Sequence, residues 1–469
     1  MNSLVRVLGV SRVHPDEVAV DAWPPPHAVK LSFLDSFHVS RKAIQRLFFY
    51  EGDELPPFET IVLSLKSSLA AALAVFLPLA GELIYLPASG EVAIDYSPDA
   101  VSSGVTFIEA EYSVGGVDMR RLASDDEHQV EAFMQLVPEI EVSRLPVPLL
   151  AVQVTRPIDD RAGGGAVVAV GVAIHHAVAD GQSVWQFIKA WVAAARGGLP
   201  ADPNLVPPTF DRSMLRHPKG DELAHSILHM MSPALPVVTP RILADIAQQR
   251  RRTFLLLAGE IQSVKRSISE SKTGREQLYN PPSSYVSICA LAWTSVVRAK
   301  SLDPADDVYF LVSADCRRRL RPPADEGFFG NCVSMCVARA SAGDLCDGGS
   351  GVPRAAGALQ SAIREKLEDP LASAEGLIER FSAIPKERLT VAGSSNRFMA
   401  YETDFGWGAP RRVELVSAYG SELVMLLGAG DAGVQVSVAL DRALMEAFAA
   451  NFRRLLNAAA VNPNDIAIS

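Results

Sequence analysis

The sequence predicts an α/β protein built from two domains of similar size. Its 469 residues exceed what one hydrophobic core usually supports, because such cores rarely grow beyond about 250–300 residues. Alternating strand-like runs and amphipathic helical stretches are interspersed along the chain. A proline-rich stretch without a periodic apolar face, at 197–211, separates the halves. We therefore expect an N-terminal domain over 1–196, a crossover linker over 197–222 and a C-terminal domain over 223–469.

The first half contains helical and strand-like patterns in turn. Over 58–83, apolar residues recur at helical spacing before Pro78 and Gly81 end the helix. These apolar residues are Leu63, Leu65, Leu69, Leu73 and Phe76. Alternating runs at 90–96 and 148–156 predict strands of a mixed α/β domain. A longer apolar run predicts a buried strand at about 166–174, and a helix is expected over about 182–196.

The second half repeats this mixture. An apolar element is expected at 282–296, a buried strand at 308–315, an alternating strand at 434–441 and a closing amphipathic helix at 442–460. The segment GAGDAG, from Gly428 to Gly433, satisfies the GxGxxG pattern of dinucleotide sites. Such a site needs its glycines to open a helix, whereas a strand pattern follows here, so we predict a hairpin turn.

Composition restricts the class of protein. Hydrophobic residues make up 48% and charged residues 21%, which is typical of a soluble globular protein. The net charge of −10 argues against a nucleic-acid or anionic-membrane partner, since such surfaces require an excess of cations. Neither a signal peptide nor an uninterrupted apolar run of about 18 residues is apparent. The five cysteines lack CxxC spacing, so we expect reduced thiols, no zinc site and a cytoplasmic location.

The most informative local pattern is VVAVGVAIHHAVADGQSVW, in which His176 and Asp180 form HxxxD. A second HxxxD, at His217, lies in a polar Pro/Gly segment that would not fix its geometry. By contrast, His176 follows a buried strand, and strand ends in α/β sheets open onto clefts. The alternative is a hydrogen-bonded core histidine, and His175 should point to the opposite side of the strand. For Asp180, a structural role as helix cap or arginine partner is favoured over a role in orienting the histidine.

A second motif, Asp404-Phe405-Gly406-Trp407-Gly408, lies about 230 residues after HxxxD. This combination resembles the plant BAHD acyltransferase family, which depends on coenzyme A. The resemblance extends over nearly the whole chain, from LSFLD and QRLFFYE to PPTFDRS, ADCRRRLRPP and the closing helix. The segment FFGNC at 328–332 is similar to the YFGNC signature of the branch that acylates flavonoid and anthocyanin glycosides, with Phe328 in place of tyrosine. Asn396 stands where the family more often has proline.

The resemblance implies two chloramphenicol-acetyltransferase-like domains with mixed sheets and a channel at their interface. His176 would act there as general base on an alcohol, and Asp180 would turn away to pair with Arg317. The DFGWG motif would be structural. The resemblance also implies acyl-CoA as co-substrate, with no metal and no tightly bound cofactor, and a monomeric protein acting on small molecules.

Ligand contacts are also carried over by position. Those expected for coenzyme A are Lys265, Arg266, Lys272, Arg275 and Ser284, although the cations could instead form the solvated face of a surface helix. Those expected for the acceptor are Phe37, His38, Ser394, Ser395 and Arg397. The expected reaction moves a malonyl or hydroxycinnamoyl group to a hydroxyl of a flavonoid or other phenolic glucoside. The alternatives are another alcohol or amine acceptor, or a non-catalytic homologue that binds CoA esters or phenolics.

Overall fold

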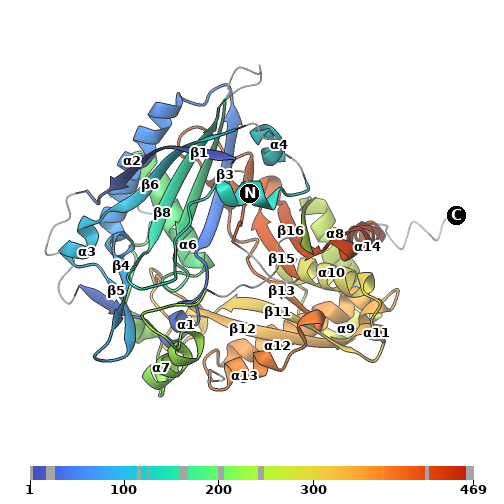
Figure 1. Ribbon diagram of the computed structural model, residues 1–469. Helices are drawn as coiled ribbons and strands as arrows, with labels where there is room; N and C mark the ends of the chain where they lie inside the picture. The colour runs from blue at the N-terminus through green and yellow to red at the C-terminus, as the bar shows by residue number, and fades with distance from the viewer. Residues whose placement is uncertain are drawn as a thin grey trace.

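The computed structural model describes residues 4–16, 27–113, 118–124, 126–158, 166–198, 205–240, 248–372, 374–417 and 422–460, except the side chains of residues 274, 275 and 277. Within them the chain forms two six-stranded sheets and one four-stranded sheet, with helices packed on them (Figure 1). Both large sheets mix parallel and antiparallel pairs. The predicted α/β class with mixed sheets is confirmed.

The elements have the following bounds. The strands are β1 Val5–Val13, β2 Ala28–Lys30, β3 Ile44–Gly52, β4 Glu82–Leu86, β5 Glu91–Asp95, β6 Val105–Tyr112, β7 Val147–Pro148, β8 Leu150–Pro157, β9 Ala166–Ile174, β10 Gln249–Leu256, β11 Asp307–Asp315, β12 Val333–Ser341, β13 Leu389–Ala392, β14 Arg412–Glu414, β15 Leu423–Gly428 and β16 Val434–Asp441. The α-helices are α1 Phe33–Ser36, α2 Phe58–Val75, α3 Pro98–Ser102, α4 Met119–Ser124, α5 Val130–Gln135, α6 Gly181–Ala195, α7 Gly220–Met231, α8 Ala258–Glu270, α9 Lys272–Gln277, α10 Ser284–Ala299, α11 Ala342–Cys346, α12 Gly351–Glu368, α13 Leu377–Ser382 and α14 Arg442–Ala460. Short 3₁₀ turns include η2 Leu77–Ala80, η3 Arg212–Met214, η5 Arg317–Arg319, η7 Ala400–Glu402 and η8 Gly430–Ala432.

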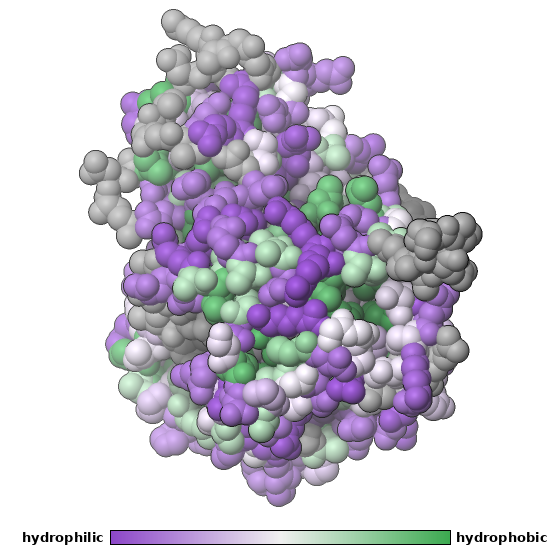
Figure 2. All heavy atoms as spheres, turned by 90° about the vertical axis from the view of Figure 1, so that its right-hand side faces the viewer, coloured by the Kyte–Doolittle hydropathy of each residue, from purple (hydrophilic) through white to green (hydrophobic). Residues whose placement is uncertain are grey.

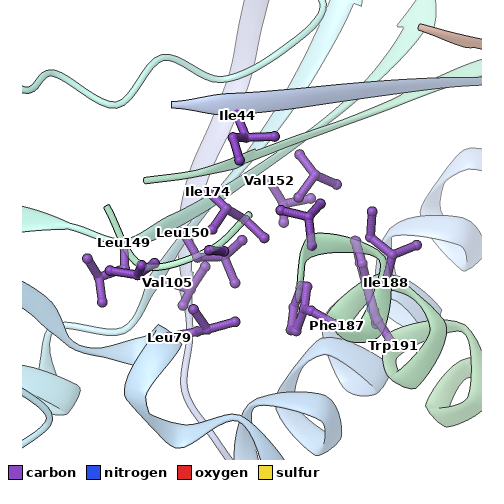
Figure 3. Packing of buried hydrophobic residues seen from close by; sticks show 14 of the residues in the cluster. Ile44, Leu79, Val105, Leu149, Leu150, Val152, Ile174, Phe187, Ile188 and Trp191 are labelled. Atoms are coloured by element: carbon purple, nitrogen blue, oxygen red, sulfur yellow. The ribbon is translucent and has the colours of Figure 1, made fainter. Parts of the chain in front are cut away.

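The first large sheet has the strand order β1-β6-β8-β9-β3-β14. Its core packs strand side chains such as Ile44 and Ile174 against Phe187, Ile188 and Trp191 of α6 (Figure 3). Helix α2 lies beside α6 on the same core. The sequence prediction for α2 was wrong at Leu63, which is exposed, because the buried stripe runs through Ile61 and Leu65 instead.

The second large sheet has the order β10-β16-β15-β13-β11-β12. Its core is formed with α8, α10, α12 and α14, and most of α10 is buried. The outer face on this side of the molecule is largely polar, with apolar residues in scattered patches (Figure 2). The GAGDAG segment joins β15 to β16 through η8, so the predicted hairpin turn is confirmed.

One strand departs from the expected division into two sequential halves. β14, at 412–414, pairs antiparallel with β3, so the second half of the chain supplies the last strand of the first sheet. The third sheet, β2-β5-β4-β7, is drawn wholly from the first half. The pairing satisfies the outer hydrogen-bonding edge of β3, which would otherwise be left open.

Helix α2 is long and apolar enough to cross a membrane when judged by length and composition alone. Leu65, Leu69 and Leu73 are fully enclosed within the first core, and Trp191 of α6 donates to the Leu65 carbonyl at 3.3 Å. A core helix of a globular domain meets the same criterion, and this packing is what such a helix makes.

Candidate active site

His176 lies in the turn between β9 and α6. The nine-residue apolar run of β9 is buried almost throughout, and Asp180 then begins α6 by accepting a hydrogen bond from the Ser183 amide at 3.0 Å. His175 is fully buried, and its Nδ1 accepts from the Ala177 amide at 3.2 Å. The His176 ring is only half-buried. His175 is therefore a core residue, whereas the His176 ring is partly accessible.

The Asp180 carboxylate is bound by Arg317 from the other half of the chain. Nη1 of Arg317 donates to Oδ2 at 2.9 Å and Nη2 donates to Oδ1 at 3.0 Å, while the Cys332 amide donates to Oδ2 at 2.9 Å. Both side chains are buried. Burial opposes ionisation of Asp180, but the charge and hydrogen bonds of Arg317 hold its pKa below the usual range. Asp180 thus bonds to Arg317 and to the Cys332 backbone and not to His176. The resemblance implies this pairing with Arg317.

A second buried ion pair lies beside the first. Asp35, the third residue of α1, accepts from Arg212 Nε at 3.1 Å and from Asn331 Nδ2 at 2.9 Å. Asn331 Nδ2 also donates to the His176 carbonyl at 2.9 Å. Arg212 Nη2 reaches the Val178 carbonyl at 3.4 Å. The turn that carries His176 is therefore held by two distant residues, Arg212 and Asn331, and Asp35 binds both of them.

The segment FFGNC joins the two halves at this point. Gly330 donates its amide to the Ser183 hydroxyl at 3.0 Å, and that hydroxyl lies 3.0 Å from the Gly330 carbonyl. A Cβ at Gly330 would meet the Arg212 guanidinium carbon at 2.8 Å, so this position requires glycine unless Arg212 moves. The aromatic ring of Phe328 lies against both Arg212 and Arg317.

The His176 imidazole is neutral at physiological pH. Burial lowers its pKa to about 4, and the positive charge of Arg41 adds to the effect. The carbonyl of His176 itself and the Asp180 charge act in the opposite direction. The ring is stacked on His38, with centroids 3.9 Å apart and planes at 14°. Burial lowers the pKa of His38 as well, so the stacked pair consists of two neutral rings.

Several buried polar atoms near His176 have no hydrogen-bond partner among the described residues. They are His38 Nδ1, Ser40 Oγ, Arg46 Nε, His175 Nε2, His176 Nδ1, Trp185 Nε1 and Asn331 Oδ1. An unsatisfied buried polar atom costs about 1–3 kcal/mol, and native proteins retain such atoms where a ligand or water completes them. His38 stacks on the His176 ring and Asn331 bonds the His176 carbonyl, so unpartnered polar atoms lie directly at this turn, as expected of a ligand site.

The DFGWG motif lies at the other end of α6. Asp404 Oδ2 accepts from Arg196 Nη1 at 2.6 Å, and Oδ1 accepts from the amides of Gly406, Trp407 and Gly408. The Trp407 ring stacks on Tyr50 of β3 at 5.3 Å, and Phe405 meets the Trp191 edge at 4.9 Å. Both glycines have positive φ values, near 100°, which explains the residue type. The motif clamps the C-terminal end of α6, as Arg317 clamps its start.

A basic pocket lies on the second half of the chain. It has a volume of about 650 Å³ and is bounded by the start of α10, the segment after β11 and one face of α12. Its lining is basic, and includes Ser283, Arg318, Arg319, Arg321 and Arg364. Arg318 directly follows the arginine that binds Asp180. The pocket thus begins next in sequence to Arg317, which contacts Asp180, and it offers several cations in a concave site.

The structure places the residues expected for coenzyme A as follows. Ser284 is the first residue of α10, beside the pocket. Lys265, Arg266 and Lys272 lie on α8 and α9, exposed or half-exposed, and do not line that pocket. The side chain of Arg275 lies outside the described residues.

The residues expected for the acceptor divide into two groups. His38 stacks on His176, and Phe37 ends α1 beside it. The Ser394 hydroxyl is engaged by the backbone of β15, where it accepts from the Leu426 amide at 2.9 Å, and Arg397 is exposed. Ser395 is half-buried, and its carbonyl accepts from the Phe398 amide. Phe398, not expected from the sequence, is the member of this segment whose ring contacts Trp185 of α6.

Comparison with known proteins identifies the family. The Transferase family profile matches residues 10–455. A malonyl-CoA:anthocyanidin 5-O-glucoside malonyltransferase of Arabidopsis thaliana is 30% identical, covering 96% of this chain and 98% of its own. The chain belongs to the BAHD acyltransferase family. Phenolic glucoside malonyltransferase 1 of Arabidopsis thaliana is 28% identical, covering 95% and 96% of the two chains.

A solved structure agrees with this BAHD assignment. Vinorine synthase superposes with a TM-score of 0.70 at 20% identity, covering 96% of this chain and 98% of its own. At that identity the likeness establishes the shared two-domain fold. The expected fold of the BAHD family is therefore confirmed over nearly the whole chain.

Sequence reasoning missed three residues that build this BAHD site: Asp35, Arg212 and Asn331. They fall within LSFLD, PPTFDRS and FFGNC, segments that carried the family resemblance but to which no contact was assigned. Charged or amide residues inside otherwise apolar segments were the available signal, because a buried polar group requires a partner.

Proposed function

We propose that this protein transfers a malonyl group from its CoA thioester to a sugar hydroxyl of a phenolic or flavonoid glucoside, with His176 as the general base. The observation that carries the proposal is the neutral, half-buried His176 ring, which lies where both halves of the chain meet, next to His38 and Asn331, each of which has an unpartnered polar atom. The names of the malonyltransferase relatives support the donor and the acceptor class. A hydroxycinnamoyl donor is the alternative within the same chemistry.

The reaction follows from elementary acyl-transfer chemistry. A proton at Nδ1, next to the carbonyl of His176, would leave Nε2 free to take the proton of the acceptor hydroxyl. The hydroxyl oxygen then attacks the thioester carbonyl, and the C–S bond breaks as the tetrahedral intermediate collapses. The imidazolium returns its proton to the departing thiolate. General base catalysis of this kind contributes roughly 10²–10⁴ in rate.

The scaffold around His176 positions the base. Arg317 holds Asp180 at the start of α6, and Asn331 holds the His176 carbonyl. Neither Asp180 oxygen is left for a direct role, because Arg317, Ser183 and Cys332 occupy both. Asp180 is therefore a positioning residue in this proposal.

The basic pocket beside α10 is the proposed site for the phosphates of coenzyme A. A protein of net charge −10 must meet these anions with local cations, and four arginines line this pocket. We further propose that the protein acts as a cytosolic monomer. The location is supported by the described cysteines, which are unpaired thiols.

The test replaces His176 with alanine and with glutamine in the full-length protein. Product formation from malonyl-CoA and a flavonoid glucoside is followed by mass detection, and CoA binding by calorimetry. We expect turnover to fall by at least about 10²-fold with CoA affinity little changed. His217→Ala, in the second HxxxD, is the matched control and should retain activity, since the His217 ring packs against Phe33 and, among the residues that the structure describes, forms no hydrogen bond or ring contact with His176 or Asp180. Full activity of His176→Ala would refute the proposal.

A further inference from the structure

Arg46 is a buried cation beside the candidate active site. It lies on β3 directly opposite Val172 of β9, and its side chain is on the same face as Ile44 and Phe48. The residue is only 6% exposed. This face is the one covered by α6, and β9 leads from it to His176.

The Arg46 guanidinium is left with one free edge. Nη1 donates to the carbonyl of the preceding residue, Gln45, at 3.0 Å, and Cζ lies 5.9 Å from the centre of the Trp185 ring. Nε is buried without an acceptor, and no carboxylate lies within 4.0 Å of the guanidinium among the residues that the structure describes. The free Nε–Nη2 edge has the geometry that binds a carboxylate through two parallel hydrogen bonds.

Three of the other four buried arginines among the described residues pair with carboxylates. Arg317 pairs with Asp180, Arg212 with Asp35 and Arg412 with Glu414. Arg46 makes no such pair, and burial lowers its pKa to about 9. A buried cation without a counter-charge is strongly unfavourable. The fold therefore keeps a cation at this place that an anionic ligand would stabilise.

The position of Arg46 limits which anion this can be. Its charge contributes to the lowered pKa of His176, and its neighbour Trp185 contacts Phe398 from the second half of the chain. The phosphates of coenzyme A are separated from the thioester by the whole pantetheine arm, and the proposed phosphate pocket lies elsewhere, at α10 and α12. In a malonyl thioester, by contrast, a single methylene separates the reacting carbonyl from a free carboxylate.

We propose that Arg46 binds the free carboxylate of a dicarboxylic acyl group, such as malonyl, and thereby selects that donor over uncharged ones. The inference rests on the proposed acyl transfer from CoA and adds the residue that decides the acyl group. A hydroxycinnamoyl or acetyl donor brings no anion to this place, so the guanidinium would stay unpaired when such a donor binds.

The test compares donors in Arg46→Gln and Arg46→Lys. Malonyl-CoA, acetyl-CoA and coumaroyl-CoA are each assayed with one flavonoid glucoside. We expect the wild type to prefer malonyl-CoA, and Arg46→Gln to lower the malonyl-to-acetyl ratio of kcat/KM by roughly 10- to 100-fold, the effect of losing charge-assisted hydrogen bonds. Arg46→Lys keeps the positive charge but cannot form the two parallel hydrogen bonds of a guanidinium, so its malonyl-to-acetyl ratio should be intermediate. The control Arg12→Gln removes a cation from β1 of the same sheet and should leave the ratio unchanged.

Thermal unfolding separates binding from a structural role. Arg46→Met should melt at the wild-type temperature or above it, because replacing an uncompensated buried charge by an apolar side chain is often neutral or stabilising. An equal loss of activity with all three donors, accompanied by a lower Tm, would overturn the inference. So would a wild type that uses acetyl- or coumaroyl-CoA in preference to malonyl-CoA, although the proposed acyl transfer would then stand.

If the wild type uses no donor, the proposed function fails and Arg46 is judged by binding alone. Malonyl-CoA and acetyl-CoA are then titrated onto the wild type and onto Arg46→Gln. Selective weakening of malonyl-CoA binding in the variant supports the inference, and equal affinities contradict it.

Discussion

Both oxygens of the Asp180 carboxylate accept from the Arg317 guanidinium, at 3.0 and 2.9 Å, across 137 residues of sequence. Arg196, at the opposite end of the same helix, donates to Asp404. Helix α6 is therefore fixed at both ends by residues of the second half of the chain. Its start carries the turn with His176, so the clamp at Asp180 determines where the base lies.

Replacing Asp180 by asparagine should leave the buried Arg317 guanidinium without its buried counter-charge, so that only the half-exposed Asp315, at 2.9 Å, still pairs with it. We expect a loss of about 3–5 kcal/mol in the free energy of unfolding, the usual cost of breaking a buried pair by removing one partner. Turnover should also fall, because α6 and the His176 turn lose their anchor. Thermal denaturation and kcat measure the two effects. Asp180→Asn with Arg317→Met should recover part of the stability and little of the activity; a double variant with restored turnover would contradict a positioning role.

The pH dependence of kcat/KM should show an unusual acid limb. A general base must be neutral, and the pKa of His176 is lowered to about 4. As the pH falls, His176 therefore becomes protonated only near that value, and activity should stay level down to about pH 5. An ordinary imidazole, with a pKa of about 6.5, would already lose activity at that higher pH. Arg41→Gln removes a positive charge that lowers this pKa, so the limb should move to higher pH. A wild-type limb near pH 6.5 would contradict the assignment of the titrating group to His176.

The DFGWG motif should act on stability more than on chemistry. Asp404→Asn weakens three hydrogen bonds from backbone amides and the contact with Arg196, so we expect a loss of about 1–2 kcal/mol. Arg196→Gln should cost less than about 1 kcal/mol, since this ion pair is partly exposed. Chemical denaturation measures both. Activity per folded molecule should fall far less than in His176→Ala, and an equal fall would place the motif in the reaction centre.

The arginines of the large pocket should control the affinity for coenzyme A. Arg318→Ala or Arg319→Ala should raise the Kd for CoA by roughly 10-fold, about 1.4 kcal/mol, and the loss should shrink at high salt because the contacts are ionic. Calorimetry at two ionic strengths tests this. Lys265→Ala and Arg266→Ala are the comparison, since these cations lie outside the pocket. A larger effect at Lys265 than at Arg318 would place the nucleotide on α8 instead.

The sequence was sufficient wherever the signal is local. The turn between β9 and α6 follows from nine consecutive apolar residues, a histidine pair and a capping aspartate, all within twenty residues. The closing helix α14 likewise has the predicted bounds, 442–460. Local periodicity fixes such elements because each depends on its neighbours in the chain.

Pairings between distant residues could not be predicted from local pattern. Arg317 was assigned to Asp180 only through the family resemblance, and the contact of Asp35 with Arg212 was not predicted at all. β14 is too short, at three residues, to stand out from its surroundings, yet it completes the first sheet. Arg46 lies in QRLFFYE, which was used only for the family resemblance, and only the packed structure reveals that its guanidinium has no counter-charge.

The place of β14 has a consequence for how the protein is made. The outer edge of β3 acquires its neighbour only when residues 412–414 have been synthesised, long after β3 itself. The first half therefore emerges from the ribosome with an open strand edge, and the first sheet is completed only after β14 of the second half has been made. A fragment ending at the crossover linker would carry that unpaired strand edge permanently and would be prone to aggregate.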